Sequence, residues 1–252
     1  MKTLAKVFLL VTLSFGLIAC QNKKADSNDS TNSNTETKTE QETVLVSKVL
    51  TAEEQAALSP DDVINIFKEG NERFINNDLT KRDHSAQVRQ TTKAQYPKAI
   101  VLSCIDSRVP VEDVFDRGIG DIFVARVAGN FVNEDILGSM EYATKVAGSK
   151  LVLVVGHEHC GAVKAAVDDV KLGNITPMLS KIKPAVNMVE YDGERNSKNA
   201  EFVAEVCKSN VKNTIAEIRA NSPIMKEMED NGEIKIVGAV YDLDTGKVSF
   251  LN

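Results

Sequence analysis

The chain has 252 residues, but no tryptophan, only three histidines and four cysteines, and aromatic residues make up 5% of it. A cysteine count this low does not support a disulfide framework. The formal net charge is −6 and no basic stripe is visible, which argues against nucleic acid as a partner. Because histidine and cysteine are scarce, any short pattern that combines them is informative.

The chain also lacks an apolar run long enough to favour a membrane-spanning helix. Its longest run, Val7 to Ile18, follows two lysines and has the pattern of a signal peptide. It ends in Leu17-Ile18-Ala19-Cys20, which resembles the bacterial lipobox. The resemblance implies that residues 1–19 are removed and that Cys20 is lipidated. An ordinary signal peptide with an incidental cysteine is the alternative.

The segment after Cys20 predicts a tether. Residues 21 to about 43 carry almost no apolar side chain and cannot bury enough surface to offset the entropy of ordering. Val44 to Leu58 is mixed, and we assign it to the tether or to a docking arm, so the predicted tether covers residues 20–58. The lipid would be the chain's only membrane contact and would place it in the cell envelope. Gln21 favours the outer membrane facing the periplasm, with surface exposure left open.

Residues 59–252 have the length of one α/β domain. Near-continuous apolar strands alternate with amphipathic helices, which predicts a mostly parallel central sheet with helices on both faces. A tight turn near Asp244 predicts an antiparallel edge strand. The predicted strands cover about 98–104, 122–127, 150–155, 234–241 and 247–251. The predicted helices cover about 60–77, 86–93, 135–147, 161–172 and 200–220.

Two short motifs follow two of these strands, about fifty residues apart. They are Cys104-Ile105-Asp106-Ser107-Arg108 and His157-Glu158-His159-Cys160. Ligands in parallel sheets bind at the carboxyl ends of strands, so two thiolates and an imidazole are expected to meet there. That set holds zinc and leaves a fourth position open. If the site is purely structural, Asp106 is the candidate fourth ligand.

The first motif also carries an acid and a base. Period-two alternation predicts that Cys104, Asp106 and Arg108 lie on one side of an extended segment. Pairing with Arg108 would lower the pKa of Asp106. Cys160 begins the predicted helix 161–172, where the helix dipole favours a thiolate.

The two motifs together resemble those of the β-class carbonic anhydrases. The similarity includes Lys68–Phe74, Gly120–Asn130 and Gly156-His157, and it extends over about residues 60 to 252. It implies reversible hydration of carbon dioxide to bicarbonate and a proton, by attack of zinc-bound hydroxide. Because two thiolates weaken zinc as a Lewis acid, activity is expected to rise into mildly alkaline pH.

The resemblance also implies a site residue by residue. One zinc ion per chain would be held by Cys104, His157 and Cys160, and the catalytic dyad would be Asp106 and Arg108. Counting from the motifs places the carbon dioxide pocket on Gln95, Phe123, Tyr142 and Gly161. Arg126 and Asn130 are expected to brace the site or the dimer contact, and His159 is a candidate proton relay.

Assembly and regulation follow from the same resemblance. Family members are built on dimers, so a homodimer or higher homo-oligomer is expected. One branch of the family has a tryptophan three residues before the first cysteine and binds inhibitory bicarbonate beside the site. Val101 occupies that position here, so the inhibitory pocket is not expected.

Three other readings remain open at the level of sequence. The same fold hydrolyses carbon disulfide or carbonyl sulfide in some relatives. A surface zinc-binding lipoprotein without turnover would keep the metal ligands, but it would not need the dyad. An adhesion protein that uses the tether to present the domain would not need the dyad either.

Overall fold

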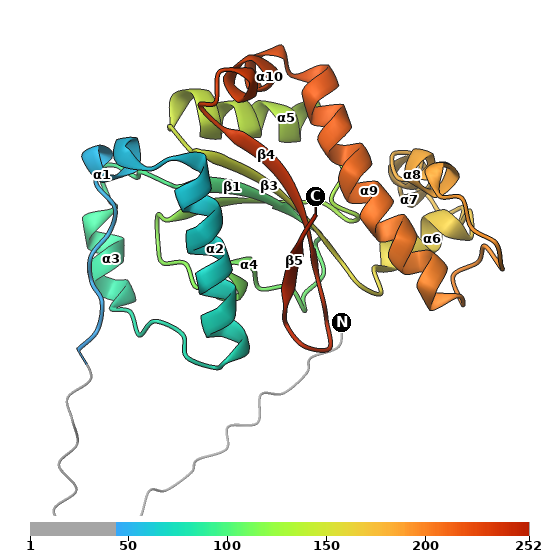
Figure 1. Cartoon of the computed structure of the whole chain (residues 1–252), viewed down its shortest axis with the longest axis horizontal. Helices are drawn as coiled ribbons and strands as arrows, with labels where there is room; N and C mark the ends of the chain where they lie inside the picture. The colour runs from blue at the N-terminus through green and yellow to red at the C-terminus, as the bar shows by residue number, and fades with distance from the viewer. Residues whose placement is uncertain (1–43, 252) are drawn as a thin grey trace, which may run out of the picture. The chain divides into compact units, whose positions relative to one another are not determined.

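The computed structural model describes residues 44–251 (Figure 1). The predicted signal peptide, Cys20 and residues 20–43 of the tether lie outside this range. The helices are α1 (Ala52–Ala57), α2 (Pro60–Ile75), α3 (His84–Gln90), α4 (Val111–Val114), α5 (Glu134–Glu141), α6 (Gly161–Val167), α7 (Ile175–Leu179), α8 (Lys183–Met188), α9 (Ala200–Asn221) and α10 (Pro223–Asp230). The strands are β1 (Ala99–Ser103), β2 (Ile122–Arg126), β3 (Leu151–His157), β4 (Lys235–Tyr241) and β5 (Val248–Phe250).

The five strands form one sheet in the order β2-β1-β3-β4-β5. Neighbouring strands from β2 to β4 are parallel, and β5 pairs with β4 in the antiparallel direction. This topology confirms the predicted α/β domain with its mostly parallel sheet and antiparallel edge strand. In this sheet the carboxyl ends of β1 and β3 lie side by side, because Ser103 is in register with Val155.

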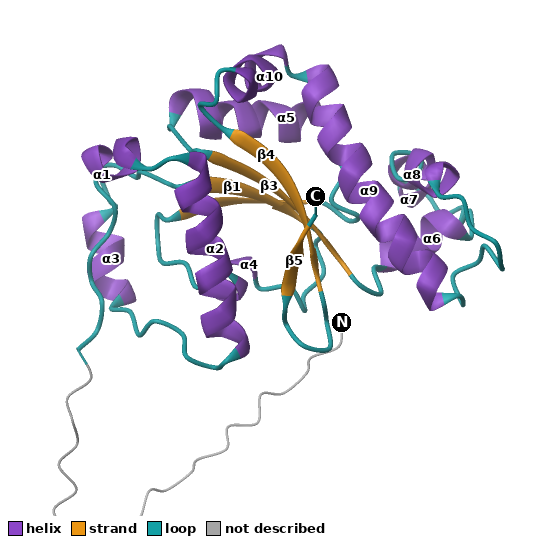
Figure 2. Cartoon of the chain, in the orientation of Figure 1, coloured by secondary structure: helices purple, strands orange, loops and turns teal. Residues whose placement is uncertain are grey.

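Helices cover both faces of the sheet (Figure 2). The strand side chains alternate between two cores, as the pleat requires. In β1, Val101 packs with α2 and α4 residues, whereas Leu102 packs with α5, α9 and α10 residues. Burial on both faces explains why the parallel strands read as continuous apolar runs in the sequence.

The helix predicted near residues 60–77 is α2, and its start is specified locally. The Ser59 side chain accepts a hydrogen bond from the Asp62 N–H, and the Asp62 carboxylate accepts one from the Ser59 N–H. Pro60 follows at the first helical position, where its missing N–H costs nothing. On its inner face, Phe67 stacks at a tilt on Phe115, with ring centroids 4.8 Å apart.

Residues 44–58 belong to the folded domain and not to the tether, which corrects the predicted boundary at residue 59. Val46 pairs with Arg82 in a short parallel bridge. Helix α1 begins with a capping box at Thr51. The buried Gln55 side chain then donates hydrogen bonds to the carbonyls of Pro97 and Ala147, at 2.7 and 2.9 Å. These partners are about 40 and 90 residues away, so the mixed composition of the segment gave no sign of them.

Other boundaries differ in smaller ways. The helix predicted for 161–172 ends at Val167, and α7 and α8 were not predicted. The helix predicted for 135–147 is present as α5, but it continues into η1, a π-helical turn at Tyr142–Val146. Across residues 44–251, none of the helices has the length and apolar content needed to cross a membrane.

Candidate metal centre and active site

The carboxyl ends of β1 and β3 bring together three of the predicted site residues. Cys104 directly follows β1, His157 is the last residue of β3, and Cys160 is the N-cap of α6. The three ligand atoms all lie within 4.8 Å of one another, and all three residues are buried. The structure thus assembles the predicted Cys, His and Cys set from segments that are distant in the sequence.

The geometry of this set fits a zinc ion. The two sulfur atoms of Cys104 and Cys160 are 4.0 Å apart, close to the roughly 3.8 Å that two thiolates span in a tetrahedral zinc site. Nδ1 of His157 lies 2.8 Å from the Glu158 carbonyl oxygen, to which it donates. That bond leaves a lone pair on Nε2, which is buried without a hydrogen-bond partner among the described residues. A bound metal would satisfy this nitrogen.

The protonation states of the Cys104 and Cys160 thiols depend on each other. The hydrogen bond between them lowers the pKa of Cys104. The same contact, together with burial, raises the pKa of Cys160. One thiol therefore retains its proton in the metal-free protein, and metal binding would release it.

Asp106 and Arg108 form a close ion pair beside the three ligands. The Arg108 guanidinium grips the carboxylate through Nε at 2.9 Å and Nη2 at 2.8 Å, and the Arg108 backbone N–H adds a third bond at 3.0 Å. The hydrogen bonds from Arg108 hold the pKa of Asp106 well below its usual range. The Asp106 carboxylate also lies near the ring of His157, with Oδ2 3.7 Å from Nε2.

The prediction of an extended segment from Cys104 to Arg108 is wrong, because the chain bends at Ile105 and turns at Ser107 and Arg108. The pairing of Asp106 with Arg108 therefore comes from a turn stabilised by the Asp106 side chain.

Arg126 braces the loop that carries Asp106, as expected. Its guanidinium donates to the Cys104 carbonyl at 2.9 Å and to the Val109 carbonyl at 2.6 Å. These two carbonyls flank the dyad, so one side chain at the end of β2 ties both ends of the loop together.

Two further contacts to the ligands were not foreseen from the sequence. The Gly129 N–H points at Cys104 Sγ, 3.4 Å away. The Cys207 thiol donates to the His157 carbonyl at 3.2 Å. Cys207 is buried, and burial raises its pKa to about 12. It therefore supports the end of β3 and is not a reactive thiol.

The predicted pocket residues are divided between two places. Gly161 begins α6 next to Cys160, and the space where a side chain would stand is open. Gln95 precedes β1 and so lies at the opposite end of that strand from Cys104. Phe123 is aligned with Ile100, three residues before the end of β1, or roughly 10 Å along the strand.

Phe123 and Tyr142 form a separate apolar surface. Their rings meet edge to face with centroids 6.2 Å apart. They line a cavity of about 660 Å³ between β2 and α5, together with Ile100 and Ile136. Within one protomer, these two aromatic residues and Gln95 are not brought to the metal ligands.

His159 does not join the ligand set either. It adopts a left-handed backbone conformation, with φ of 53°. Its ring groups instead with the carboxylates of Glu158 and Asp244, at the exposed edge of the β4–β5 turn.

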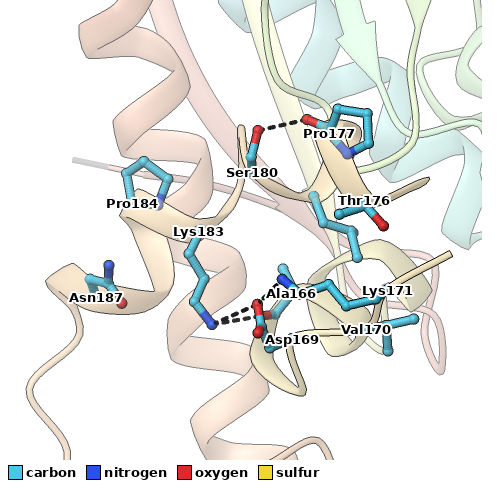
Figure 3. A pocket seen from close by; sticks show the side chains of 11 residues that line it. Ala166, Asp169, Val170, Lys171, Thr176, Pro177, Ser180, Lys183, Pro184 and Asn187 are labelled. Carbon is cyan, nitrogen blue, oxygen red and sulfur yellow. Dashed lines mark hydrogen bonds and ion pairs between the residues drawn. The ribbon is translucent and has the colours of Figure 1, made fainter. Parts of the chain in front are cut away.

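Another cavity, of about 490 Å³, lies between the end of α6 and helices α7 and α8 (Figure 3). Lys171 and Lys183 both reach Asp169 there, at 2.9 and 3.7 Å. None of the residues of the Cys104 cluster lines this cavity. This cavity is therefore separate from the Cys104, His157 and Cys160 cluster.

Known proteins resemble this chain in sequence and in fold. The family model of the carbonic anhydrases matches residues 99–248. Carbonic anhydrase 2 of Mycobacterium tuberculosis is 37% identical over 187 residues, which is 72% of this chain and 87% of the relative. The chain therefore belongs to the carbonic anhydrase family.

Solved structures agree on the fold. The β-carbonic anhydrase of Coccomyxa, determined with acetazolamide, matches 75% of this chain and 84% of its own, with a TM-score of 0.59 and 24% identity. A tetrameric β-carbonic anhydrase of the ascomycete Sordaria macrospora matches 67% of this chain and 90% of its own, with a TM-score of 0.57 and 22% identity. The prediction of a β-class carbonic anhydrase from the two motifs is confirmed.

Proposed function

We propose that this protein catalyses the reversible hydration of carbon dioxide to bicarbonate and a proton, with one zinc ion per chain as cofactor. One observation carries the proposal. An ionised Asp106, gripped by Arg108, lies 3.7 Å from the unpartnered nitrogen of His157 in a buried set of two cysteines and a histidine. A purely structural site would not need the guanidinium grip on Asp106.

The residues divide the work by position. Cys104, His157 and Cys160 would hold the metal. When bound, zinc lowers the pKa of a coordinated water, so that a nucleophile is available at moderate pH. Asp106 remains ionised and accepts a hydrogen bond from the attacking oxygen, which orients a lone pair toward the carbon of carbon dioxide. Arg108 holds the Asp106 carboxylate in position and keeps that carboxylate ionised.

The product side of the site is open. Gly161 carries no side chain and lies beside Cys160 at an exposed position. We place the outgoing bicarbonate near its backbone N–H. The proton leaves to solvent buffer, which balances the reaction: carbon dioxide and water give bicarbonate and one proton.

A second copy of the chain would complete the apolar part of the pocket. Strand β2 ends the sheet, with no strand on its outer side in residues 44–251. Tyr142 beside it is 53% exposed. Since Gln95, Phe123 and Tyr142 lie away from the metal ligands of their own protomer, we propose a homodimer or higher homo-oligomer in which they face the partner's site. The tetrameric state of the Sordaria enzyme supports this arrangement.

We also propose that the enzyme is a lipoprotein of the cell envelope, anchored through Cys20 at the outer membrane. The support is the leader of residues 1–19, the lipobox-like Leu17-Ile18-Ala19-Cys20 and the polar composition of the residues that follow. Mass spectrometry of the N-terminal peptide from the native host tests it. An unmodified N-terminal cysteine, or an uncleaved leader, would contradict it.

Stopped-flow hydration of carbon dioxide by the zinc-loaded full chain is the decisive experiment for the activity. We expect rapid hydration that rises from about pH 6.5 to about pH 9 and is lost on chelation. Cys160→Ser, which replaces a metal ligand, should lose both the metal and the activity. A folded, zinc-loaded oligomer that hydrates no carbon dioxide across that range would rule the proposal out, and carbon disulfide would be the next substrate to assay.

A further inference from the structure

A tight turn after β2 directs the Gly129 backbone N–H at the Cys104 sulfur, 3.4 Å away. The Asn130 N–H donates to the Val127 carbonyl at 3.0 Å, which closes a four-residue turn. Gly129, the third residue, has φ of +82°, whereas Ala128 is not among the residues with positive φ. That combination defines a type II turn, which needs glycine at this position. In a type I turn the central peptide faces the opposite way, and the Gly129 N–H would leave the sulfur.

Two side chains of helix α9 donate hydrogen bonds to the same turn. The Asn210 side-chain amide donates to the Gly129 carbonyl at 2.7 Å. Four residues later, Thr214 donates its hydroxyl to the Asn130 carbonyl at 3.2 Å. Asn210 and Thr214 are each 1% exposed. Burying a polar group costs free energy unless the group is hydrogen-bonded. The side-chain donors of Asn210 and Thr214 find their acceptors in the two carbonyls of the turn.

We propose that Asn210 is a positioning residue for the Cys104 thiolate, because it holds the turn in the form that points the Gly129 N–H at the sulfur. This inference rests on the proposed metal site. An N–H donated to a metal-bound thiolate withdraws electron density from the sulfur and fixes its orientation. A side chain on α9, which touches none of the reacting atoms, thereby positions the ligand through the backbone of Gly129.

The test uses the full chain loaded with either cobalt(II) or zinc. Asn210→Leu removes the donor at similar volume, and Thr214→Val removes the second grip without changing shape. Ser209→Ala is the matched control, because Ser209 lies on the same helix and donates to the Ala185 carbonyl at 2.9 Å, away from the turn. The readouts are the thiolate-to-cobalt charge-transfer band, the rate of zinc release to a chelator, and the melting temperature.

We expect Asn210→Leu to move the charge-transfer band to longer wavelength, because loss of the N–H donor raises the energy of the sulfur lone pairs. Zinc release should become about tenfold faster, the lower end of the effect of contacts that support metal ligands. Thr214→Val should shift the charge-transfer band and the zinc-release rate in the same directions, but by less. Ser209→Ala should lower the melting temperature without changing the charge-transfer band or the zinc-release rate.

Two results would overturn the inference, and they are distinguishable. A normal charge-transfer band and zinc-release rate in both Asn210→Leu and Thr214→Val would remove the positioning role and leave the metal site standing. If the parent chain shows no thiolate charge-transfer band with cobalt(II), the metal site itself fails, and the positioning role fails with it. Should Asn210→Leu not fold, Thr214→Val decides the first question alone.

Discussion

The protein contains two aspartate–arginine clusters ten residues apart, and they are built in opposite ways. The Asp106 carboxylate takes its hydrogen bonds from its near neighbour Arg108, whose side chain is 55% exposed. Asp116 is fully buried and takes hydrogen bonds from Arg73, Arg82 and Thr80. Its partners come from three separate points between residues 73 and 82, so Asp116 ties the end of α2 and the following loop to the loop after α4.

The difference lies in what remains unsatisfied. Both carboxylate oxygens of Asp116 are occupied by donors from the protein. The Asp106 cluster instead adjoins a buried imidazole nitrogen without a partner. A saturated cluster stabilises the fold, whereas a cluster with spare hydrogen-bonding capacity next to metal ligands can act on a substrate.

Asp106→Asn should have the largest effect on activity. It removes the ionised acceptor that orients the nucleophile, so kcat/KM for carbon dioxide hydration should fall about 10²-fold or more. The melting temperature should change by no more than about 4 °C, because an exposed ion pair adds little to stability. Stopped-flow kinetics and calorimetry on the zinc-loaded variant measure both. An active Asp106→Asn enzyme would show that the Asp106 cluster, like the Asp116 cluster, has no catalytic role.

Asp116→Asn should show the reverse pattern. Removing the charge leaves the buried guanidinium of Arg82 uncompensated, which costs about 3–5 kcal/mol and lowers the melting temperature by roughly 10 °C. Zinc content and kcat/KM of the folded fraction should stay near those of the parent. Glu205→Gln, which breaks an exposed pair with Lys208, is the control and should cost almost nothing. A drop in kcat/KM without loss of stability would contradict the structural role of Asp116.

The pH dependence of stability should separate the clusters further. Burial alone would raise the pKa of Asp116, but the hydrogen bonds from Arg82, Thr80 and Arg73 outweigh it and lower the pKa to about 2. The folded-state pKa lies below the unfolded one, so the contribution is present above about pH 4 and is lost as the pH falls toward 2. It amounts to about 2 kcal/mol.

Urea denaturation of the metal-free parent and of Asp116→Asn at stepped pH measures this contribution. The gap in unfolding free energy between the two proteins should narrow as the pH falls through this window. A gap that stays constant down to the acid limit of folding would show that Asp116 has an ordinary pKa.

Arg108→Lys should have a smaller effect than Asp106→Asn or Asp116→Asn. Lysine keeps the positive charge but cannot reproduce the two-nitrogen grip on Asp106. We expect kcat/KM to fall about tenfold, with a smaller change in metal content. Arg219→Lys is the matched control, because Arg219 grips Glu229 through Nε and Nη2 in the same way, away from the metal ligands. Equal losses in both variants would show that the effect is general instability.

The sequence predicted more of the fold than of the pocket. The five strands were found within one or two residues. β1 and β3 were clear because their apolar runs are buried on both faces, and β5 was clear because of the tight turn before it. Helix α1 was missed because its stability depends on the distant partners of Gln55. The contact from Gly129 to Cys104 was missed because the only local signal was an Ala-Gly-Asn turn with no apparent target.

The candidate metal ligands and the Asp106–Arg108 pair could be predicted from the sequence alone, since two strand ends carry Cys104 with Asp106 and His157 with Cys160. Local motifs suffice there, because parallel neighbouring strands must bring their carboxyl ends together. Only the tertiary structure showed how differently Asp106 and Asp116 are surrounded, and which peptide faces the Cys104 sulfur. Asp106 and Asp116 look alike in sequence, and they differ in the number of distant donors that reach them once the chain is folded.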